Sequence, residues 1–508
     1  MPAEVQATAL LGSARLNLAL IGFLGCIIIY ALRTNVSVAI VCMVNSTAVE
    51  MLSGADGTNV ANRPTTYAPP PNDSEPVQKD TIMGELLWKK NEQGYVLSAF
   101  FWGYMLSQIL GGYLADRYGG RFVIGFTVLG SAIFTLISPV AATTSVFAFI
   151  VVRALMGFMQ GAIFPAFHTM WSMWAPPLER SLLTGLTYAG AQVGNTAVMP
   201  LSGLLCKYGF AGGWPSIFYI LGAVGILWCL LWFFYVSDRP ARSKRISKQE
   251  LNYIENSLAD ILASNSKKGK RAVPWLAMMK SVPVWAIFCG HFAGDWGAYI
   301  MMTVLPTFIK DVLGLDFTSL GFLSAIPYIA YFIFINLGGF VADKLQNANI
   351  LSTIATRRLA MIVGSITAEI TALGGQAIFL MASAYCGRNQ MTLLIIFLTL
   401  GIGLSGVQYA GFVVNYLDIA PTFAGPLLGI GNTISCLAGI IAPMMAGQLT
   451  SRGTQQEWQL VFWITAGVLI AGTTIFCLFA KGEVQPWAVA DKEEDCELEK
   501  KLNNSDNS

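Results

Sequence analysis

Two stretches of the chain resemble each other: LSAFFWGYMLSQILGGYLADR at residues 97–117 and LSAIPYIAYFIFINLGGFVADK at residues 323–344. Both begin with Leu-Ser-Ala, both contain Leu-Gly-Gly, and both end with Ala-Asp followed by Arg or Lys. Each copy occupies the second apolar run of a block of six. Parallel six-helix halves are one architecture of membrane transporters, with the substrate site near the midplane between the halves. A helix-packing motif explains either copy alone, but the matched pair predicts two such halves.

The composition agrees with a membrane protein. Of the 508 residues, 55% are apolar and only 12% are charged, whereas soluble domains carry about 25% charged residues. A bilayer core about 30 Å thick needs roughly 20 apolar residues per helix. Twelve runs of this kind lie at residues 16–44, 93–114, 122–139, 145–171, 181–205, 213–236, 284–309, 319–342, 359–385, 391–414, 421–449 and 457–480. The predicted fold class is therefore all-α and polytopic, with twelve transmembrane helices arranged as two six-helix pseudo-repeats.

Several classes of protein are excluded by the same composition. The formal net charge is only +2, so the chain lacks the excess of basic residues that is typical of nucleic-acid-binding proteins. The nine Cys residues are scattered without paired spacing, so we expect neither a disulfide framework nor a zinc site, and no cofactor. No Ser/His/Asp, Cys/His, metal-ligand or phosphate-loop constellation stands outside the apolar runs, which argues against an enzyme.

The domain boundaries follow from the runs and the charges. We expect an N-terminal segment at 1–15, a first half at 16–236 with a polar loop at 45–92, a connector at 237–283, a second half at 284–480 and a disordered acidic tail at 481–508. A short helix is predicted in the connector from Lys248 to Ala263. With both ends in the cytosol, 21 of the 31 Lys and Arg residues lie on the cytosolic side and 8 on the other, as the positive-inside rule requires. The sequon at Asn72 then lies on the glycosylated side.

Ionisable side chains at membrane depth are few, namely Arg33, Arg153, His168, His291, Asp295 and Glu369. Such groups are costly in lipid and by default face a polar pathway. Arg33 offers a planar, permanently charged fork that suits a carboxylate or a phosphate, so we interpret it as a substrate-binding residue. The alternative is a structural ion pair with Asp295 or Glu369. For Glu369 itself we expect a structural role.

Arg153, Gln160 and His168 fall in the run 145–171, at spacings that place them on one broad face of a continuous helix. Fifteen residues at 1.5 Å each separate Arg153 from His168 by about 22 Å. The two residues therefore mark different depths of one polar path, with Arg153 nearer the non-cytosolic mouth. For His168, a role in binding or proton transfer and a role as a neutral, hydrogen-bonded core histidine both remain open.

His291 and Asp295 are four residues apart in the run 284–309, so the two side chains can meet on one helix face. We interpret the pair as a proton or cation site, and a local ion pair that merely satisfies both groups is the alternative. Proline residues are expected to interrupt helices at Pro165, Pro200, Pro306, Pro327 and Pro443.

Both repeats end in charged residues at the predicted cytosolic rim. Asp116 has Arg117 and Arg121 beside it, and Asp343 is followed by Lys344. These charges can pair at the rim and cap neighbouring helix ends, so we interpret them as a gate rather than as a substrate site. The same gating or capping role is predicted for Asp418, which follows the run 391–414.

The chain also resembles a known superfamily. The segment GYLADRYGGR at 112–121 is similar to the loop signature between helices 2 and 3 of the major facilitator superfamily. Further segments resemble its anion symporter family, which comprises sialin, the vesicular glutamate transporters and the sodium-phosphate cotransporters. These segments are FFWGYMLSQILGGY (100–113), FPAFHTMWSMWAPPLERS (164–181), TYAGAQVGN (187–195), NYLDIAP (415–421) and EWQLVFWI (457–464). The resemblance spans both halves and implies the major facilitator fold.

The resemblance implies further site residues. In this family a helix-1 Arg within the pattern YALR-x-N is associated with anion binding, and residues 30–35 match the pattern, so Tyr30 and Asn35 join Arg33. The family carries an Arg and a His where this chain has Arg153 and His168. It often has an acid, linked to proton coupling, where this chain has Gln160.

Two positions separate the chain from one branch of the family. Vesicular glutamate transporters carry an Arg where this chain has Gly294, and a His where it has Leu97. Both absences argue against a vesicular carrier that loads glutamate.

The predicted function is secondary-active transport of a small organic anion, of the acidic sugar or carboxylate class, by alternating access. Protons are favoured as the coupling ion, with Asp295 as the carrier in place of the missing acid at Gln160. Sodium-dependent phosphate uptake is the alternative within the same fold. A membrane sensor or receptor that transports nothing is the alternative from a different functional class. A monomer in a lysosomal, vesicular or plasma membrane is expected, with no partner besides the anion and the bilayer.

Overall fold

The computed structural model describes residues 9–488 apart from 47, 50, 52–83, 177–178, 268–272, 349 and 366–374. Asn72, Glu369 and most of the predicted tail therefore lie outside the described residues. Each predicted apolar run coincides with helix, although the run 359–385 is described only in part. Within the described residues, eight spans are long and apolar enough to cross a membrane. The long helices α3, α7 and α11 fall outside this set, and each packs against a helix of the other half.

The helices follow the predicted division of the chain. The first half contains α1 (Ala14–Met43), α3 (Lys90–Tyr118), α4 (Gly120–Thr144), α5 (Val146–Gly161), α6 (Ile163–Trp174), α7 (Arg180–Tyr208) and α8 (Trp214–Tyr235). The connector contains α9 (Lys248–Lys267), which confirms the helix predicted there, and the short α10 (Trp275–Lys280). The second half contains α11 (Val282–Leu313), α12 (Phe317–Asn347), α13 (Thr353–Ser365), α14 (Gln376–Tyr385), α15 (Met391–Ser405), α16 (Phe412–Ile419), α17 (Ala424–Leu449) and α18 (Gln455–Phe479).

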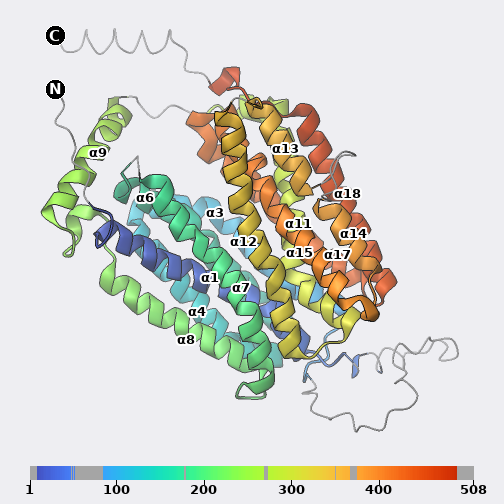
Figure 1. The fold of residues 1–508 in the computed structure, drawn as a ribbon. Helices are drawn as coiled ribbons and strands as arrows, with labels where there is room; N and C mark the ends of the chain where they lie inside the picture. Colours follow the sequence, from blue (N-terminus) through green and yellow to red (C-terminus); the bar gives the residue numbers. More distant parts are fainter. Residues whose placement is uncertain are drawn as a thin grey trace, which may run out of the picture.

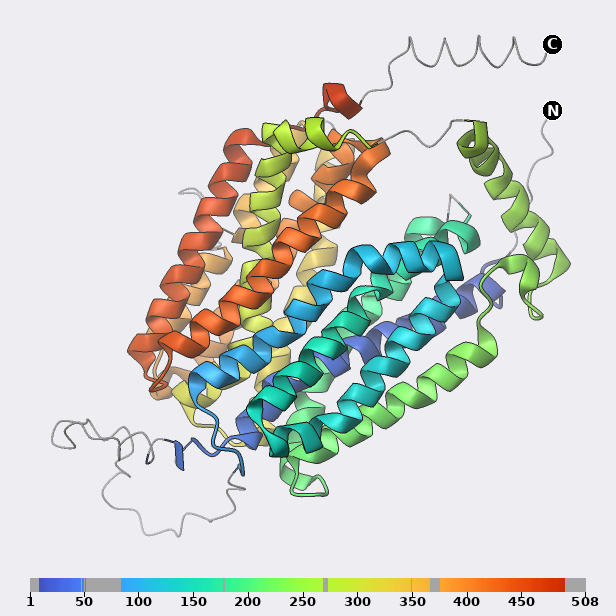
Figure 2. The same cartoon turned by 180° about the vertical axis from the view of Figure 1, so that it is seen from behind.

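The two halves form separate bundles that meet at one side and diverge at the other (Figure 2). We call the side where α1 ends and α3 begins the loop side, and the side where α1 begins the terminal side (Figure 1). Between the halves, α1 packs against α11, α3 against α17, and α7 against α12. These three pairs bring together the helices that hold the candidate site.

The contacts between the halves gather at the loop side. Lys90 Nζ lies 2.6 Å from Asp311 Oδ2, in an ion pair between α3 and α11. A Cβ on Gly94 of α3 would lie 2.7 Å from the carbonyl oxygen of Pro443 on α17, so only glycine permits this approach. At the terminal-side end of α17, by contrast, a Cβ on Gly425 would meet no atom within 4 Å. The structure is therefore closed on the loop side, and the two halves diverge toward the terminal side (Figure 2).

The fourth apolar run of each half changes its local helix type along its length. The run 145–171 forms α5 and α6, which are separated by Ala162, and the run 391–414 forms α15, the 3-10 helix η4 (Gly406–Ala410) and α16. Each run is nevertheless one membrane-crossing span, Val146–Trp174 and Met391–Ile419, and Ala162 itself keeps αR dihedral angles. The face shared by Gln160 and His168 stays a prediction. A 3-10 segment inside a helix is often a hinge or a functional site.

Most of the predicted proline interruptions are wrong. Pro200, Pro306, Pro327 and Pro443 lie inside α7, α11, α12 and α17, which continue through them. Each proline removes one backbone N–H, and membrane helices tolerate this because neighbouring groups satisfy the freed carbonyl. Pro165 stands near the beginning of α6, three residues after the break at Ala162.

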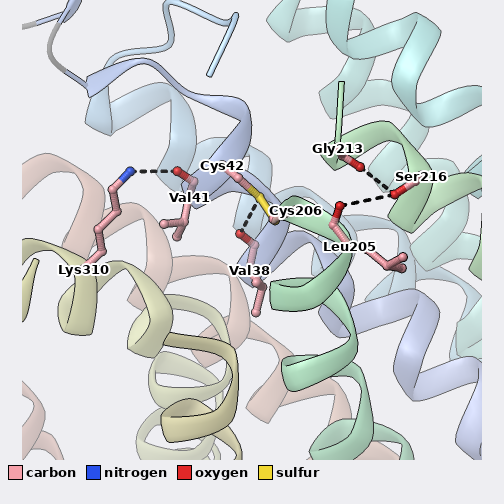
Figure 3. The surroundings of a disulfide bond; sticks show 8 residues. All are labelled: Val38, Val41, Cys42, Leu205, Cys206, Gly213, Ser216 and Lys310. Atoms are coloured by element: carbon pink, nitrogen blue, oxygen red, sulfur yellow. Dashed lines mark hydrogen bonds between the residues drawn. A yellow bond between two sulfur atoms is a disulfide. The ribbon is translucent and has the colours of Figure 1, made fainter. Parts of the chain in front are cut away.

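A disulfide joins Cys42 at the end of α1 to Cys206 near the end of α7 (Figure 3). The expectation of no disulfide was therefore wrong. The two cysteines are 164 residues apart in the sequence, so no local spacing signals the pair, and only the packing of α1 against α7 brings them together. Lys310 of α11 donates to the carbonyl of Val41 at 2.9 Å, so a contact between the halves lies beside the disulfide (Figure 3).

The connector helix α9 is fixed to the first half. The fully buried Arg15 of α1 pairs with Glu179 (2.6 Å) and with Glu250 of α9 (3.2 Å). Glu250 also accepts hydrogen bonds from the backbone N–H groups of Ala14 and Arg15 at the N-terminus of α1. Burial and the neighbouring Glu179 raise the pKa of the Tyr253 hydroxyl, which donates to Glu179. The glutamate of the motif at 164–181 is therefore part of this anchor.

Candidate functional site

Arg33 lies in an aromatic cage in α1 and is only 5% exposed. Its guanidinium carbon is 4.8–5.5 Å from the centroids of five rings. Four rings come from α1 and α3 of the first half and one from α11 of the second: Tyr30, Phe100, Phe101, Tyr104 and Tyr299. Among the described residues, Nε and Nη2 have no hydrogen-bond partner. Arg33 and Asp295 form no ion pair, because Asp295 pairs with His291 instead.

The cage replaces only part of the missing counter-charge. A cation over an aromatic ring gains about 0.5–2 kcal/mol, more where water is excluded. A buried charge without an opposite partner is nevertheless costly. Arg33 is therefore held in a site that an incoming anion would stabilise.

Arg153 of α5 is 2% exposed and contacts the backbone of α1. Its Nη2 donates to the carbonyl of Arg33 at 3.0 Å, and its Nη1 lies 3.5 Å from the carbonyl of Leu32. Arg153 thus fixes the α1 backbone at the residue that carries the caged guanidinium. The two arginines add two positive charges to one small region.

Arg33 and Arg153 line one cavity between the halves, together with Leu97 of α3 and Met302 of α11. The cavity measures about 10 Å³, which is room for about one water molecule. An organic anion can enter only when the walls from α3 and α11 move apart.

The other predicted binding residues lie around this centre at different places. Tyr30 contributes a cage ring at 5.5 Å. Asn35 is fully buried, and its amide has no hydrogen-bond partner within the described residues, but it does not line the cavity. Gln160, at the end of α5, is also buried. His168 is exposed on α6 and contacts the ring of Tyr188 at 5.6 Å. The structure therefore does not bring His168 into the Arg33 cavity, and both roles predicted for it stay predictions.

The predicted pair in the second half is formed. His291 Nε2 lies 3.4 Å from Asp295 Oδ2 on the same face of α11. Three aromatic residues around the η4 break complete the surroundings: Tyr416 lies 3.0 Å from His291 Nδ1, Tyr409 lies 3.4 Å from Asp295 Oδ1, and Phe412 stacks on the imidazole. Both members are less than 5% exposed. The arrangement can hold or release a proton while every polar atom of the pair keeps a partner.

Gly294 is enclosed by the same break. A Cβ at this position would lie 3.0 Å from the Phe412 ring and 3.1 Å from the Gln408 side chain. A larger residue there would require the Phe412 ring or the Gln408 side chain to shift by a few tenths of an ångström.

The gating residues have separate surroundings in this structure. The side chains of Asp116 and Asp343 lie outside what the structure describes, although both residues are on described helices. Arg117 donates to the Tyr113 hydroxyl at 2.9 Å, and the backbone N–H of Arg121 donates to Asp238 at 3.3 Å. Lys344 is exposed and lies 5.0 Å from the ring of Phe340. The predicted rim pairing therefore stays a prediction.

Asp418 has a partner that the sequence did not indicate. Arg357 of α13 binds its carboxylate through Nε (2.8 Å) and Nη2 (3.3 Å), and Asn415 also donates to it. Arg357 and Asp418 are 61 positions apart in the sequence, so no local pattern indicates the pair. Asp418 therefore joins α13 to α16 through an ion pair, and its predicted gating or capping role stays a prediction.

Comparisons with known proteins agree with this architecture. Residues 22–443 match the model of the Major Facilitator Superfamily. The chain is 52% identical to "Uncharacterized transporter slc-17.2" of Caenorhabditis elegans over 490 residues, covering 96% of this chain and 95% of that protein. It is 42% identical to sialin of Homo sapiens over 488 residues, covering 96% and 93%. The solved structure of a D-xylose-proton symporter superposes with a TM-score of 0.65 at 16% identity, covering 92% of this chain and 99% of that one.

These relatives are transporters rather than enzymes, as the absence of a catalytic constellation predicts. The likeness to the symporter structure supports the fold, with two six-helix halves around a central cavity. The relatives above 40% identity cover nearly the whole chain. The chain therefore belongs to the major facilitator superfamily and, within it, to the anion symporter family of sialin.

Proposed function

We propose that the chain is a proton-coupled symporter of a small organic anion, of the acidic sugar or carboxylate class. The observation that carries the proposal is the caged Arg33, a buried guanidinium at the contact between the halves without a described carboxylate partner. A planar fork of this kind suits a carboxylate. The sialin relative supports the substrate class.

Alternating access follows from the position of the cage. Four of its rings belong to the first half and Tyr299 belongs to the second, so separation of the halves on the loop side would take Tyr299 away from Arg33. The guanidinium would then exchange an aromatic contact for an anion. Binding of the anion and movement of the halves are coupled in this way.

His291 and Asp295 are the proposed coupling pair. Both are buried on α11, and Asp295 precedes Tyr299 by about one turn of the helix. A proton on this pair changes the charge beside the helix that completes the Arg33 cage. Gln160 stands where relatives often have an acid, and its amide cannot carry a proton. Asp295 is therefore the carboxylate best placed to carry the coupling proton.

The proposed orientation has both termini in the cytosol. The disulfide between Cys42 and Cys206 lies at the loop-side ends of α1 and α7, and disulfides persist in oxidising compartments. This supports a luminal or extracellular loop side, as the distribution of Lys and Arg does. A lysosomal, vesicular or plasma membrane fits this orientation.

Sodium-dependent phosphate uptake is the second candidate, because the same guanidinium fork suits a phosphate. The test is uptake into proteoliposomes that contain the purified full chain. Acidic sugars, carboxylates and inorganic phosphate are each offered under a pH gradient without sodium and under a sodium gradient at equal pH. We expect accumulation of an organic anion under the pH gradient alone. Accumulation of phosphate that follows only the sodium gradient would overturn the proposal in favour of the second candidate.

A further inference from the structure

A groove of about 300 Å³ is lined by residues of α1, of the end of α8 and of the segment that follows α8. The beginning of α1 lies beside the end of α8 (Figures 1 and 2). The walls of the groove include Leu20 of α1 and Tyr235 of α8, which are 44% and 46% exposed. Further along the same helices, large apolar side chains such as Leu24 and Leu230 are also exposed. Surfaces of this kind on spanning helices face lipid. The groove therefore opens toward the bilayer at its terminal side.

The groove has an apolar end and a polar end. Leu20, Ile21 and Leu231 line the part that lies deeper in the membrane. There the indole of Trp228 donates to the carbonyl of Ile21 at 3.0 Å, so that this backbone group is satisfied. The polar end is lined by Asn17 of α1 and by three residues that follow α8 in the chain: Ser237, Ser243 and Arg245. This gradient matches a molecule with an acyl chain and a polar head.

Arg245 is held in place at the polar end. Its Nη1 donates to the carbonyl of Phe234 at 3.0 Å. Its guanidinium carbon lies 3.8 Å from the centroid of the Tyr235 ring and 4.8 Å from that of Phe234. Within the described part of the chain, Arg245 forms no ion pair. The charge is therefore fixed before a ligand arrives, which lowers the entropic cost of binding an anion.

The segment around Arg245 is strongly basic. Five exposed basic residues lie between residues 239 and 248, with no acidic residue among them: Arg239, Arg242, Lys244, Arg245 and Lys248. Asp238, which precedes them, accepts a hydrogen bond from the backbone N–H of Arg121. The nearest following acid, Glu250, is buried and paired with Arg15. Clusters of four to eight Lys or Arg next to a spanning helix attract anionic lipid headgroups, at roughly 1 kcal/mol per basic residue.

We propose that this groove is a binding site for an anionic phospholipid of the terminal-side leaflet. The phosphate lies against Arg245 and Ser243, and one acyl chain lies along Leu20 and Leu231 between α1 and α8. The bound lipid joins α1 to the segment that leads from α8 to α9. The site lies outside the cavity between the halves, so the proposal does not depend on which anion is transported.

The first test compares lipid binding by matched variants of the full-length protein. Native mass spectrometry measures binding of phosphatidylserine and of phosphatidylcholine to the wild-type protein, Arg245→Ala, Arg245→Lys and Lys280→Ala. Lys280 is an exposed connector residue on α10 that does not line the groove. We expect Arg245→Ala to weaken phosphatidylserine binding about fivefold, while Arg245→Lys and Lys280→Ala keep most of it. Equal losses of phosphatidylserine binding in Arg245→Ala and Lys280→Ala would mean that general surface charge attracts the lipid. That result would contradict a specific site in the groove.

The second test separates a groove from a surface contact. Leu231→Trp fills the apolar end and leaves every charge in place, and its melting temperature in phosphatidylcholine reports whether the fold is intact. We expect this variant to lose phosphatidylserine binding at least as strongly as Arg245→Ala. Water-soluble glycerophosphoserine, which has the headgroup and no acyl chain, is expected not to compete. Unchanged binding by a folded Leu231→Trp, or effective competition by the headgroup alone, would contradict a phospholipid in the groove.

Discussion

Arg33 and Asp295 are buried charges on the first helix of each six-helix half, and their surroundings differ. Arg33 rests on five aromatic rings and has no described carboxylate partner. Asp295 has His291 and Tyr409 beside it on α11 and η4. The repeated fold thus carries an unbalanced cation in one half and a balanced acid–base pair in the other. The first half is prepared for an external anion, whereas the second can change its charge with a proton.

The contacts between the halves connect the two centres. Tyr299 follows Asp295 by one turn of α11 and supplies the only ring of the described Arg33 cage that comes from the second half. A change at the acid–base pair therefore reaches the cage through a single helix. The predictions below separate the two centres and then the contacts that hold the halves together.

The largest effect is expected for Arg33→Lys. Lysine keeps the charge but loses the planar fork that binds a carboxylate through two hydrogen bonds. Loss of one charge-assisted hydrogen bond costs about 1.5–3 kcal/mol, so initial uptake should fall at least about tenfold while the protein still reaches the membrane. Arg452→Lys, an exposed residue on the loop side, is the matched control. Normal uptake by Arg33→Lys would refute the fork argument.

Asp295→Asn should separate coupling from binding. The amide keeps the size of the side chain but cannot take up or release the proton. We expect accumulation driven by a pH gradient to be abolished, while exchange of labelled anion for unlabelled anion stays partly intact. The control is Glu255→Gln on the exposed face of α9. Equal loss of exchange and accumulation would assign Asp295 to substrate binding or to structure, and no loss of either would remove it from the mechanism.

Lys90→Ala tests the closed loop side. The Lys90–Asp311 pair joins the halves at 2.6 Å with both side chains less than 20% exposed. Removing this ion pair should destabilise the closed state by about 1 kcal/mol. The equilibrium would then shift about fivefold toward the state that is open on the loop side. A cysteine at Thr303, which lines the Arg33 cavity, is labelled from the loop side in a background that keeps only Cys42 and Cys206.

The neighbouring Lys89→Ala removes the same charge from an exposed residue without a contact to Asp311. It should leave the labelling rate unchanged. Identical rates in both variants would mean that glycine packing, and not the ion pair, keeps the loop side closed.

The smallest effect is expected for Asp116→Asn at the terminal-side rim. If the rim charges act as a gate, the balance between the two open states should change a few-fold while the affinity for the anion stays within about twofold. The same labelling assay, with reagent added from each side in turn, measures the balance. An unchanged balance with full uptake would leave Asp116 with a packing role only.

Features set by residues close in sequence were predictable. The apolar runs give the helices because a bilayer requires about 20 such residues per span. The four-residue spacing of His291 and Asp295 predicts their contact, and the short helix predicted from Lys248 to Ala263 corresponds to α9. The repeat at 97–117 and 323–344 gives the two halves, since each copy marks the same helix of a block.

Only the tertiary structure decided the surroundings of these residues. The rings around Arg33 come from three helices, and the disulfide of Cys42 and Cys206 spans 164 residues. The turn at Ala162 and the 3-10 segment η4 lie within uninterrupted apolar runs, because hydrophobicity reports burial in lipid and not the local type of helix. The sequence by itself thus determined which segments cross the membrane and which charges lie within it. Contacts between distant helices decided which of those charges are paired and which are left for a ligand.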